Sequence, residues 1–194
     1  MTVPRLWVVA GPNGAGKTTL AAERLVRRVP VVNPDSIALD LPRLAGRLDQ
    51  REAGVRALQA RKGLLAHRVD FAIETTLSGH GILRFLDQAR DAGYEISLNY
   101  VGLATPWLAV RRVTDRVLAG GHEVPLDQIM RRYRQSLLQL PKAMGVAHHT
   151  RLFDNSDLRR RLIAVLDAEG IRWLANDLPI WARGVIDPFT LGCR

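Results

Sequence analysis

Apolar runs of strand length alternate with longer segments of helical periodicity along most of this chain. The apolar runs predict strands near residues 6–10, 29–33, 71–74, 96–103 and 151–154. Between the strands, the spacing predicts helices over 17–28, about 50–68, 82–92, 106–118 and 126–144. This alternation is typical of an α/β fold, here a three-layer sandwich around a mostly parallel central sheet.

The pattern changes after residues 154–156. The apolar segments 162–166 and 171–174 flank the polar stretch 167–170, which predicts a hairpin rather than another crossover. A last helix near 179–186 is expected to close the edge of the sheet. Because no linker or repeat interrupts the pattern, the 194 residues are expected to form one domain.

A phosphate-binding loop follows the first predicted strand. Residues 11–18 read Gly-Pro-Asn-Gly-Ala-Gly-Lys-Thr, and a predicted helix begins at once. Glycines let successive N–H groups face the β-phosphate, Lys17 reaches the β/γ oxygens and the Thr18 hydroxyl takes one Mg²⁺ position. The sequence therefore predicts binding of a nucleoside triphosphate by Gly11, Pro12, Asn13, Gly14, Ala15, Gly16, Lys17, Thr18 and Thr19.

Polar side chains also follow the next two strands, at the edge where ligands gather in such sheets. Asp35 follows the second strand and is a candidate base for an acceptor hydroxyl. It is also a candidate N-cap of residues 36–38, and the two roles are compatible. Glu74 ends the third strand, before Thr75 and Thr76. These three are candidates for binding acceptor hydroxyls, although Glu74 is also compatible with a surface residue that caps the next helix.

Two arginine-bearing helices flank Gly120 and Gly121, and this segment, about 106–144, is a candidate lid. A glycine pair between such helices suits closure over phosphates, whereas two solvated helix surfaces are the alternative. The candidate lid residues are Arg111, Arg112, Arg116, Arg131, Arg132 and Arg134.

Composition limits the other functions. The chain is 47% hydrophobic and 24% charged, without the roughly 20 consecutive apolar residues of a membrane span. Its first residues lead directly into a strand, so no signal peptide is expected. Cys193 is the single cysteine, which excludes an internal disulfide and favours a cytoplasmic protein. The net charge of +9 suits nucleic acid, an acidic metabolite or an acidic inhibitor equally well.

With these blocks the chain resembles the zeta toxin family of P-loop kinases. The resemblance rests on residues 11–19, 33–35, 73–77 and 111–140, which occur in the expected order. It implies transfer of a phosphoryl group from ATP, with Mg²⁺, to a nucleotide sugar such as UDP-N-acetylglucosamine. It also implies Asp35 as catalytic base, Glu74 and Thr76 on the acceptor, Arg112 on the donor phosphates, and an antitoxin protein as a partner.

The chain departs from the family pattern in the lid. Toxins of the family carry a second arginine three residues before a proline, and His122 occupies this position relative to Pro125. A neutral imidazole does not clamp phosphate as a guanidinium does. Arg116, Arg131 and Arg132 are therefore the candidate replacements.

Two other functions remain open from the sequence. A polynucleotide 5′-hydroxyl kinase is compatible with the basic charge, although nucleic acid is not the expected partner. A nucleotide-dependent switch would need the phosphate loop but no base, so substitution of Asp35 would leave its turnover intact.

Overall fold

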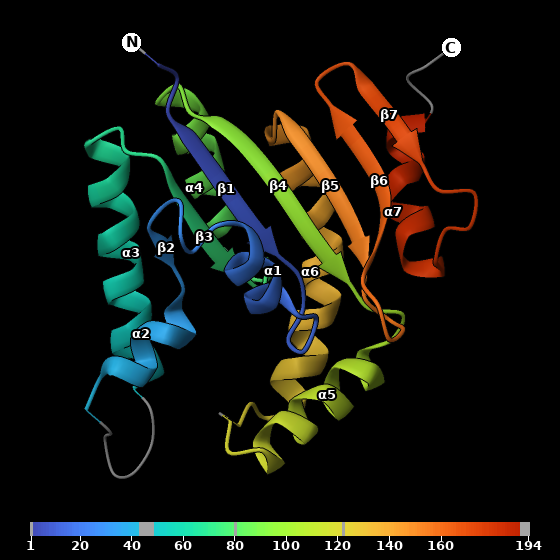
Figure 1. Cartoon of the computed structure of the whole chain (residues 1–194), viewed down its shortest axis with the longest axis horizontal. Coiled ribbons are helices and arrows are strands. Elements are labelled where there is room, and N and C mark those ends of the chain that lie inside the picture. The colour runs from blue at the N-terminus through green and yellow to red at the C-terminus, as the bar shows by residue number, and fades with distance from the viewer. Residues whose placement is uncertain (1, 43–48, 80, 122, 191–194) are drawn as a thin grey trace.

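A computed structural model describes residues 2–42, 49–79, 81–121 and 123–190. One sheet holds the strands in the order β2-β3-β1-β4-β5-β6-β7 (Figure 1). The first five in this order are parallel, and β6 and β7 continue as an antiparallel hairpin. The strands are β1 (Arg5–Ala10), β2 (Val31–Val32), β3 (Phe71–Thr75), β4 (Glu95–Gly102), β5 (His149–Asp154), β6 (Arg161–Asp167) and β7 (Gly170–Leu174).

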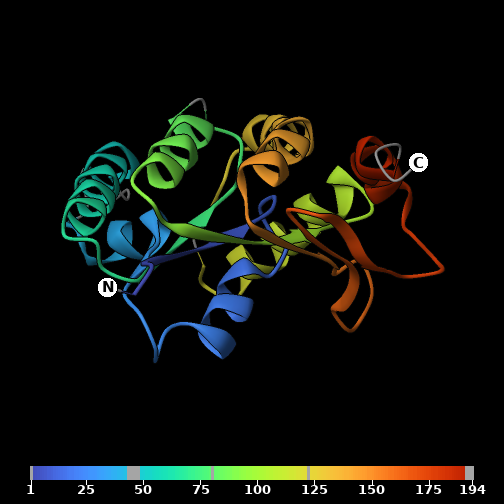
Figure 2. The same ribbon diagram turned by 90° about the horizontal axis from the view of Figure 1, so that it is seen from above.

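Helices cover the two faces of this sheet unequally. Figure 2 shows α3, α4, α6 and α7 on one face and the short α1 on the other. The helices are α1 (Lys17–Arg24), α2 (Pro34–Asp40), α3 (Gln50–Ala66), α4 (Gly81–Asp91), α5 (Pro106–Leu118), α6 (Leu126–Val146) and α7 (Ile180–Thr190). None of these described helices is both long and apolar enough to cross a membrane.

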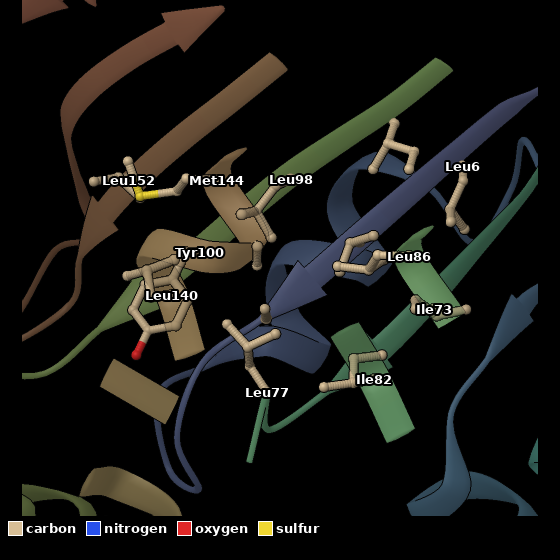
Figure 3. Close-up of a cluster of buried hydrophobic side chains, with 14 of the residues drawn as sticks. Leu6, Ile73, Leu77, Ile82, Leu86, Leu98, Tyr100, Leu140, Met144 and Leu152 are labelled. Carbon is tan, nitrogen blue, oxygen red and sulfur yellow. The ribbon is translucent and has the colours of Figure 1, made fainter. Parts of the chain in front are cut away.

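The main core lies under the face that carries four helices. Leu6, Ile73 and Leu98 come from neighbouring parallel strands and pack against Leu86 of α4 and Leu140 of α6 (Figure 3). Because such strands are buried on both faces, their sequences are almost continuously apolar, which is the signal that predicted them. The α/β class, the mostly parallel sheet and the C-terminal hairpin are confirmed.

The observed bounds of α1 and β2 differ from the predicted ones. The first helix ends at Arg24, not at residue 28, and β2 has two residues instead of five. Pro30 disfavours helical conformation in the residue before it, and the N–H of Arg28 closes a turn on the Leu25 carbonyl. Helix α2 was not predicted as a separate element, and Pro34 provides its first helical position.

The glycine pair after α5 forms the C-cap of that helix. Gly120 has a φ of +87°, its N–H donates to the Val117 carbonyl, and the N–H of Gly121 donates to the Arg116 carbonyl. These two bonds define a Schellman motif. Helix α5 and the first half of α6 then extend beyond the carboxyl edge of the sheet (Figure 1).

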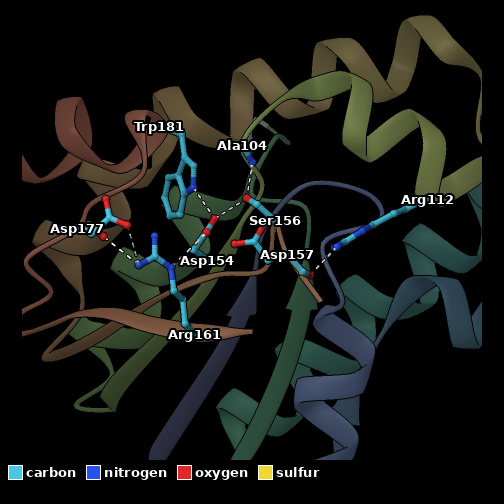
Figure 4. Close-up of polar contacts among 8 residues, drawn as sticks. All are labelled: Ala104, Arg112, Asp154, Ser156, Asp157, Arg161, Asp177 and Trp181. Atoms are coloured by element: carbon cyan, nitrogen blue, oxygen red, sulfur yellow. Dashed lines mark hydrogen bonds and ion pairs between the residues drawn. The ribbon is translucent and has the colours of Figure 1, made fainter. Parts of the chain in front are cut away.

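A buried carboxylate at the end of β5 holds the C-terminal helix to the sheet. Asp154 Oδ1 accepts hydrogen bonds from Trp181 Nε1 at 3.0 Å and from Ser156 Oγ at 2.6 Å (Figure 4). Ser156 Oγ in turn accepts from the N–H of Ala104 at 2.8 Å. Asp154 therefore joins α7, the loop after β4 and the loop after β5.

We expect Gly102→Ala to lower the free energy of unfolding by about 1–3 kcal/mol, because the new Cβ would lie 2.2 Å from the Trp181 ring. Gly63→Ala is the matched control: nothing lies within 4 Å of its Cβ position, and it sits inside α3. Helix propensity should make this variant more stable by roughly 0.5–1 kcal/mol. Urea unfolding of both variants tests the pair, and equal stabilities would contradict the Trp181 packing.

Candidate active site

The phosphate loop crosses over the end of β4 at very short range. Gly11 has a φ of +142°, and a Cβ at this position would lie 2.2 Å from the Val101 carbonyl oxygen. Only glycine permits this approach. The loop then enters α1 through Gly16, whose φ of +87° is left-handed. The local geometry agrees with the strand–loop–helix context that predicted the motif.

Lys17 is enclosed at the centre of the site. Its side chain is 9% exposed, and Nζ donates to the Pro12 carbonyl oxygen at 2.9 Å. Burial lowers the pKa of Lys17, while the nearby carboxylates Glu74 and Asp35 oppose this shift. An ammonium group at the start of a helix, with carboxylates nearby, is suited to bind a polyphosphate together with a metal ion.

Glu74 joins three segments of the site. It is 6% exposed, Oε1 accepts from the Thr18 hydroxyl at 2.9 Å, and Oε2 accepts from Asn33 Nδ2 at 2.8 Å. Burial raises the pKa of Glu74, and Lys17 and the Thr18 hydrogen bond oppose that rise. The alternative of a surface residue capping the next helix is therefore wrong for Glu74.

Asp35 lies in the first turn of α2 with an exposed side chain. The helix N-cap is Asn33, whose Oδ1 accepts from the Asp35 N–H at 2.8 Å. The reading of Asp35 as the N-cap is thus wrong, because capping is done by the residue two positions earlier. Its carboxylate is left to face the cavity beside Lys17.

One cavity of about 500 Å³ brings the predicted groups together. It is open to Lys17 from the phosphate loop, to the segments after β2 and β3, and to α6. Predicted site residues in its wall are Lys17, Asp35, Glu74, Thr75, Thr76, Arg131 and Arg132.

The lid arginines divide into two groups. Arg112 lies beside Gly14 and its Nη2 donates to the Asp157 carbonyl at 3.3 Å, outside the cavity wall (Figure 4). Arg116 acts electrostatically on both Lys17 and Glu74, and Arg132 acts on Lys17 and interacts with Asp35. His122 lies outside the described residues.

Sequence reasoning missed two supporting residues. Asn155 follows β5 and its Nδ2 donates to the Ala15 carbonyl at 2.9 Å, which braces the phosphate loop from behind. The rule that polar residues after parallel strands form the site would have found it. Arg61 lines the cavity from α3 and is 8% exposed. Its spacing from the buried Ala53 and Ala57 places it on the inner face of that helix.

Comparison with known proteins agrees with this geometry. The sequence profile of the family described as Zeta toxin matches residues 2–161. An uncharacterized protein of Haemophilus influenzae is 30% identical over 140 residues, which are 69% of this chain and all of that protein.

Two solved structures share the fold at 15% identity. A chain of the AvrRxo1-ORF1:AvrRxo1-ORF2 complex with sulphate ions has a TM-score of 0.69, covering 94% of this chain and 63% of that one. A chain of the Streptococcus pneumoniae PezAT toxin–antitoxin system has a TM-score of 0.66, covering 99% and 80%. This chain thus spans less than two thirds of the AvrRxo1 chain.

A phosphate loop with a carboxylate beside it, at the carboxyl edge of the parallel strands, is characteristic of a P-loop phosphotransferase. The match over residues 2–161 shows that the chain belongs to the zeta toxin family.

The raised pKa of Glu74 predicts a pH dependence of stability. Folding favours the protonated carboxyl, so the contribution of Glu74 to stability is complete below pH 4.5, the unfolded pKa, and is lost as pH rises through the folded pKa. The stability of the wild type relative to Glu74→Gln should therefore fall with rising pH, by at most about 1.4 kcal/mol per pH unit. Urea unfolding between pH 4.5 and 8 measures this, and a rising difference would contradict burial as the dominant effect.

Proposed function

We propose that this protein transfers the γ-phosphoryl group of ATP to a hydroxyl group of an anionic acceptor of the nucleotide-sugar class, such as UDP-N-acetylglucosamine. The observation that best supports this proposal is that one cavity is lined by groups suited to both substrates. These residues are Lys17, Asp35, Arg61, Glu74 and Thr76. A donor-binding cation and a free carboxylate thus share one space with hydroxyl-binding groups.

Asp35 is the proposed base. It is exposed in the cavity wall, and its backbone is fixed by the Asn33 cap rather than by its own carboxylate. As the acceptor oxygen forms its bond to the γ-phosphorus, the bond from this phosphorus to the β–γ bridging oxygen breaks. The hydroxyl proton passes to Asp35, and ADP leaves with the electron pair of the broken bond.

Cations on three elements would neutralise the transferring group. Lys17 is proposed for the β/γ oxygens, with Arg116 and Arg132 as the lid cations, since both interact electrostatically with the centre. Arg112, which lies beside Gly14, is proposed for the donor phosphates. Arg116 and Arg132, rather than Arg112, are the proposed replacements for the second lid arginine of the family.

The residues at Thr18 fit a magnesium ion. The Thr18 hydroxyl donates its proton to Glu74, so the oxygen lone pairs remain available for a hard cation. Bound Mg²⁺ would supply charge neutralisation between the phosphates. Glu74 would then orient Thr18 with one carboxylate oxygen while it faces the acceptor cavity.

Arg61 supports an acceptor that carries negative charge. Its Nε has no hydrogen-bond partner, its Nη2 reaches only the Glu74 carbonyl at 3.5 Å, and no carboxylate pairs with it among the described residues. A buried guanidinium without a counter-ion is suited to a phosphate or carboxylate of the acceptor.

An antitoxin is the proposed protein partner, because the streptococcal neighbour comes from a toxin–antitoxin system. The alternative acceptor is a polynucleotide 5′-hydroxyl group. The net charge of +9 is compatible with it, and a chain of the Pnkp1/Rnl/Hen1 RNA repair complex shares the fold at 21% identity and a TM-score of 0.53.

We expect Asp35→Asn to lower kcat by about 100-fold or more, because the acceptor proton loses its base, while the Kd for ATP stays within about twofold. The assay follows label from γ-labelled ATP to UDP-N-acetylglucosamine, other nucleotide sugars, nucleosides and a 5′-hydroxyl oligonucleotide. Asp40→Asn, an exposed change in the same helix, is the control. Unchanged turnover in Asp35→Asn would exclude the base, and label only on the oligonucleotide would exclude the nucleotide-sugar acceptor.

We expect Arg61→Met to raise the KM for the acceptor about tenfold or more, because an anionic group loses its charged hydrogen bonds. The KM for ATP should not change. Arg56→Met is the control, since Arg56 lies on the same helix but is exposed and paired with Glu52. An equal effect of both variants, or an effect confined to ATP, would contradict the acceptor role of Arg61.

A further inference from the structure

A second cavity, of about 360 Å³, lies on the face of the sheet that carries α1. It is bounded by β1, β4 and β5 below and by the C-terminal half of α1 above, and it shares no lining residue with the active-site cavity. In Figure 2 this is the face that lacks the four covering helices. The cavity is thus separate from the phosphoryl-transfer site, and the proposed function does not use it.

A buried amide forms the floor of this cavity. Asn99 stands between Val9 on β1 and Arg151 on β5 in the register of the parallel strands, so the three side chains share one face. Asn99 is 7% exposed, and within the described ranges its side chain has no hydrogen bond. The amide atoms are not fully enclosed, so they remain open to the cavity, where the donor and the acceptor of a ligand could pair with them.

Apolar and aromatic groups form the walls. The half-buried indole of Trp7 and the buried side chains of Val9, Leu20 and Leu25 line the cavity around Asn99. An aromatic ring and aliphatic side chains around one amide suit a flat heterocycle whose edge carries a donor and an acceptor.

The rim is positively charged. Arg24, Arg28 and Arg151 line it, and none of them pairs with a carboxylate in the part of the chain that the structure describes. The one acidic residue in the lining, Glu23, is already bound by Arg160 at 2.5 Å. Exposed guanidinium groups without counter-ions are suited to bind a phosphate.

From these observations we propose that the cavity is a second ligand site, for a small phosphorylated heterocycle of the nucleoside monophosphate class. The Asn99 amide would pair with the base, as an Asn side chain pairs with the N6 and N7 of adenine. Trp7 and the leucines would contact the ring, and the rim arginines would bind the phosphate. The ligand would lie on α1, the same helix whose first turn carries Lys17 and Thr18.

Calorimetry with AMP as the probe tests the site. The protein is first saturated with Mg²⁺ and a non-hydrolysable ATP analogue, so that the phosphate loop is filled. We expect one AMP to bind per chain, and Asn99→Leu and Arg151→Ser each to weaken this binding about tenfold or more. Arg159→Ser removes the same charge from an exposed position outside the cavity and should have no effect.

Two further measurements show whether weaker AMP binding reflects the loss of contacts in the cavity rather than misfolding, and whether both halves of AMP are recognised. Asn99→Leu keeps the side-chain size and removes an unpaired amide, so its Tm should equal or exceed that of the wild type. Adenosine and inorganic phosphate should each bind at least about tenfold more weakly than AMP, because each supplies half of the contacts.

Several results would overturn the proposal: no heat with AMP, AMP binding that survives both cavity variants, or AMP binding that is lost in Arg61→Met and so belongs to the acceptor cavity. Phosphate that binds as tightly as AMP would show an anion site without base recognition. Binding of an oligonucleotide without any binding of AMP would show that this face is a nucleic-acid surface. None of these results depends on phosphoryl transfer, so failure of the proposed function would leave this test intact.

Discussion

The buried carboxylate of Glu74 is the constraint on which the site depends. Thr18 lies in the first turn of α1, Asn33 follows β2 and Glu74 is the last residue but one of β3. The three meet because one carboxylate oxygen of Glu74 accepts a hydrogen bond from Thr18 and the other accepts one from Asn33. A carboxylate that is 6% exposed is costly unless its oxygens are paired. The pairing therefore fixes the phosphate loop, the start of α2 and the acceptor side of the cavity relative to one another.

On the side away from Glu74, the phosphate loop is held by β4 and by the loop after β5. The loop backbone approaches Val101 of β4 closely at Gly11, and Asn155 after β5 binds the Ala15 carbonyl. In the loop after β5, Ser156 donates a hydrogen bond to Asp154, and the Asp157 carbonyl accepts one from Arg112. The backbone of the phosphate loop is thus held by contacts with neighbouring strand ends on both sides. Only the flexible side chain of Lys17 remains free to move, and it faces the cavity.

Most of the fold and the centre of the site could be predicted from the sequence, because both depend on local signals. Buried parallel strands are apolar runs, and the phosphate loop is defined by glycines whose conformations are intrinsic to that residue. Asp35 and Glu74 followed from their positions after strands. The same strand rule applies to Asn155, and helical spacing places Arg61 on the inner face of α3, but their partners do not follow from local patterns. Asn155 meets Ala15 across 140 residues of chain, and the different surroundings of Arg112 and Arg116 depend on tertiary packing.

Helix α1 contributes lining residues to both cavities, and its short length explains why the second cavity exists. This helix has eight residues, so on its face of the sheet it covers the strands near the phosphate loop but leaves Asn99 and Arg151 facing the second cavity. Arginines accumulate where negative charge is expected to bind: Arg61, Arg131 and Arg132 at the first cavity, and Arg24, Arg28 and Arg151 at the second. These two arginine clusters line separate cavities with no lining residue in common, and each cavity has the size of a small anionic ligand.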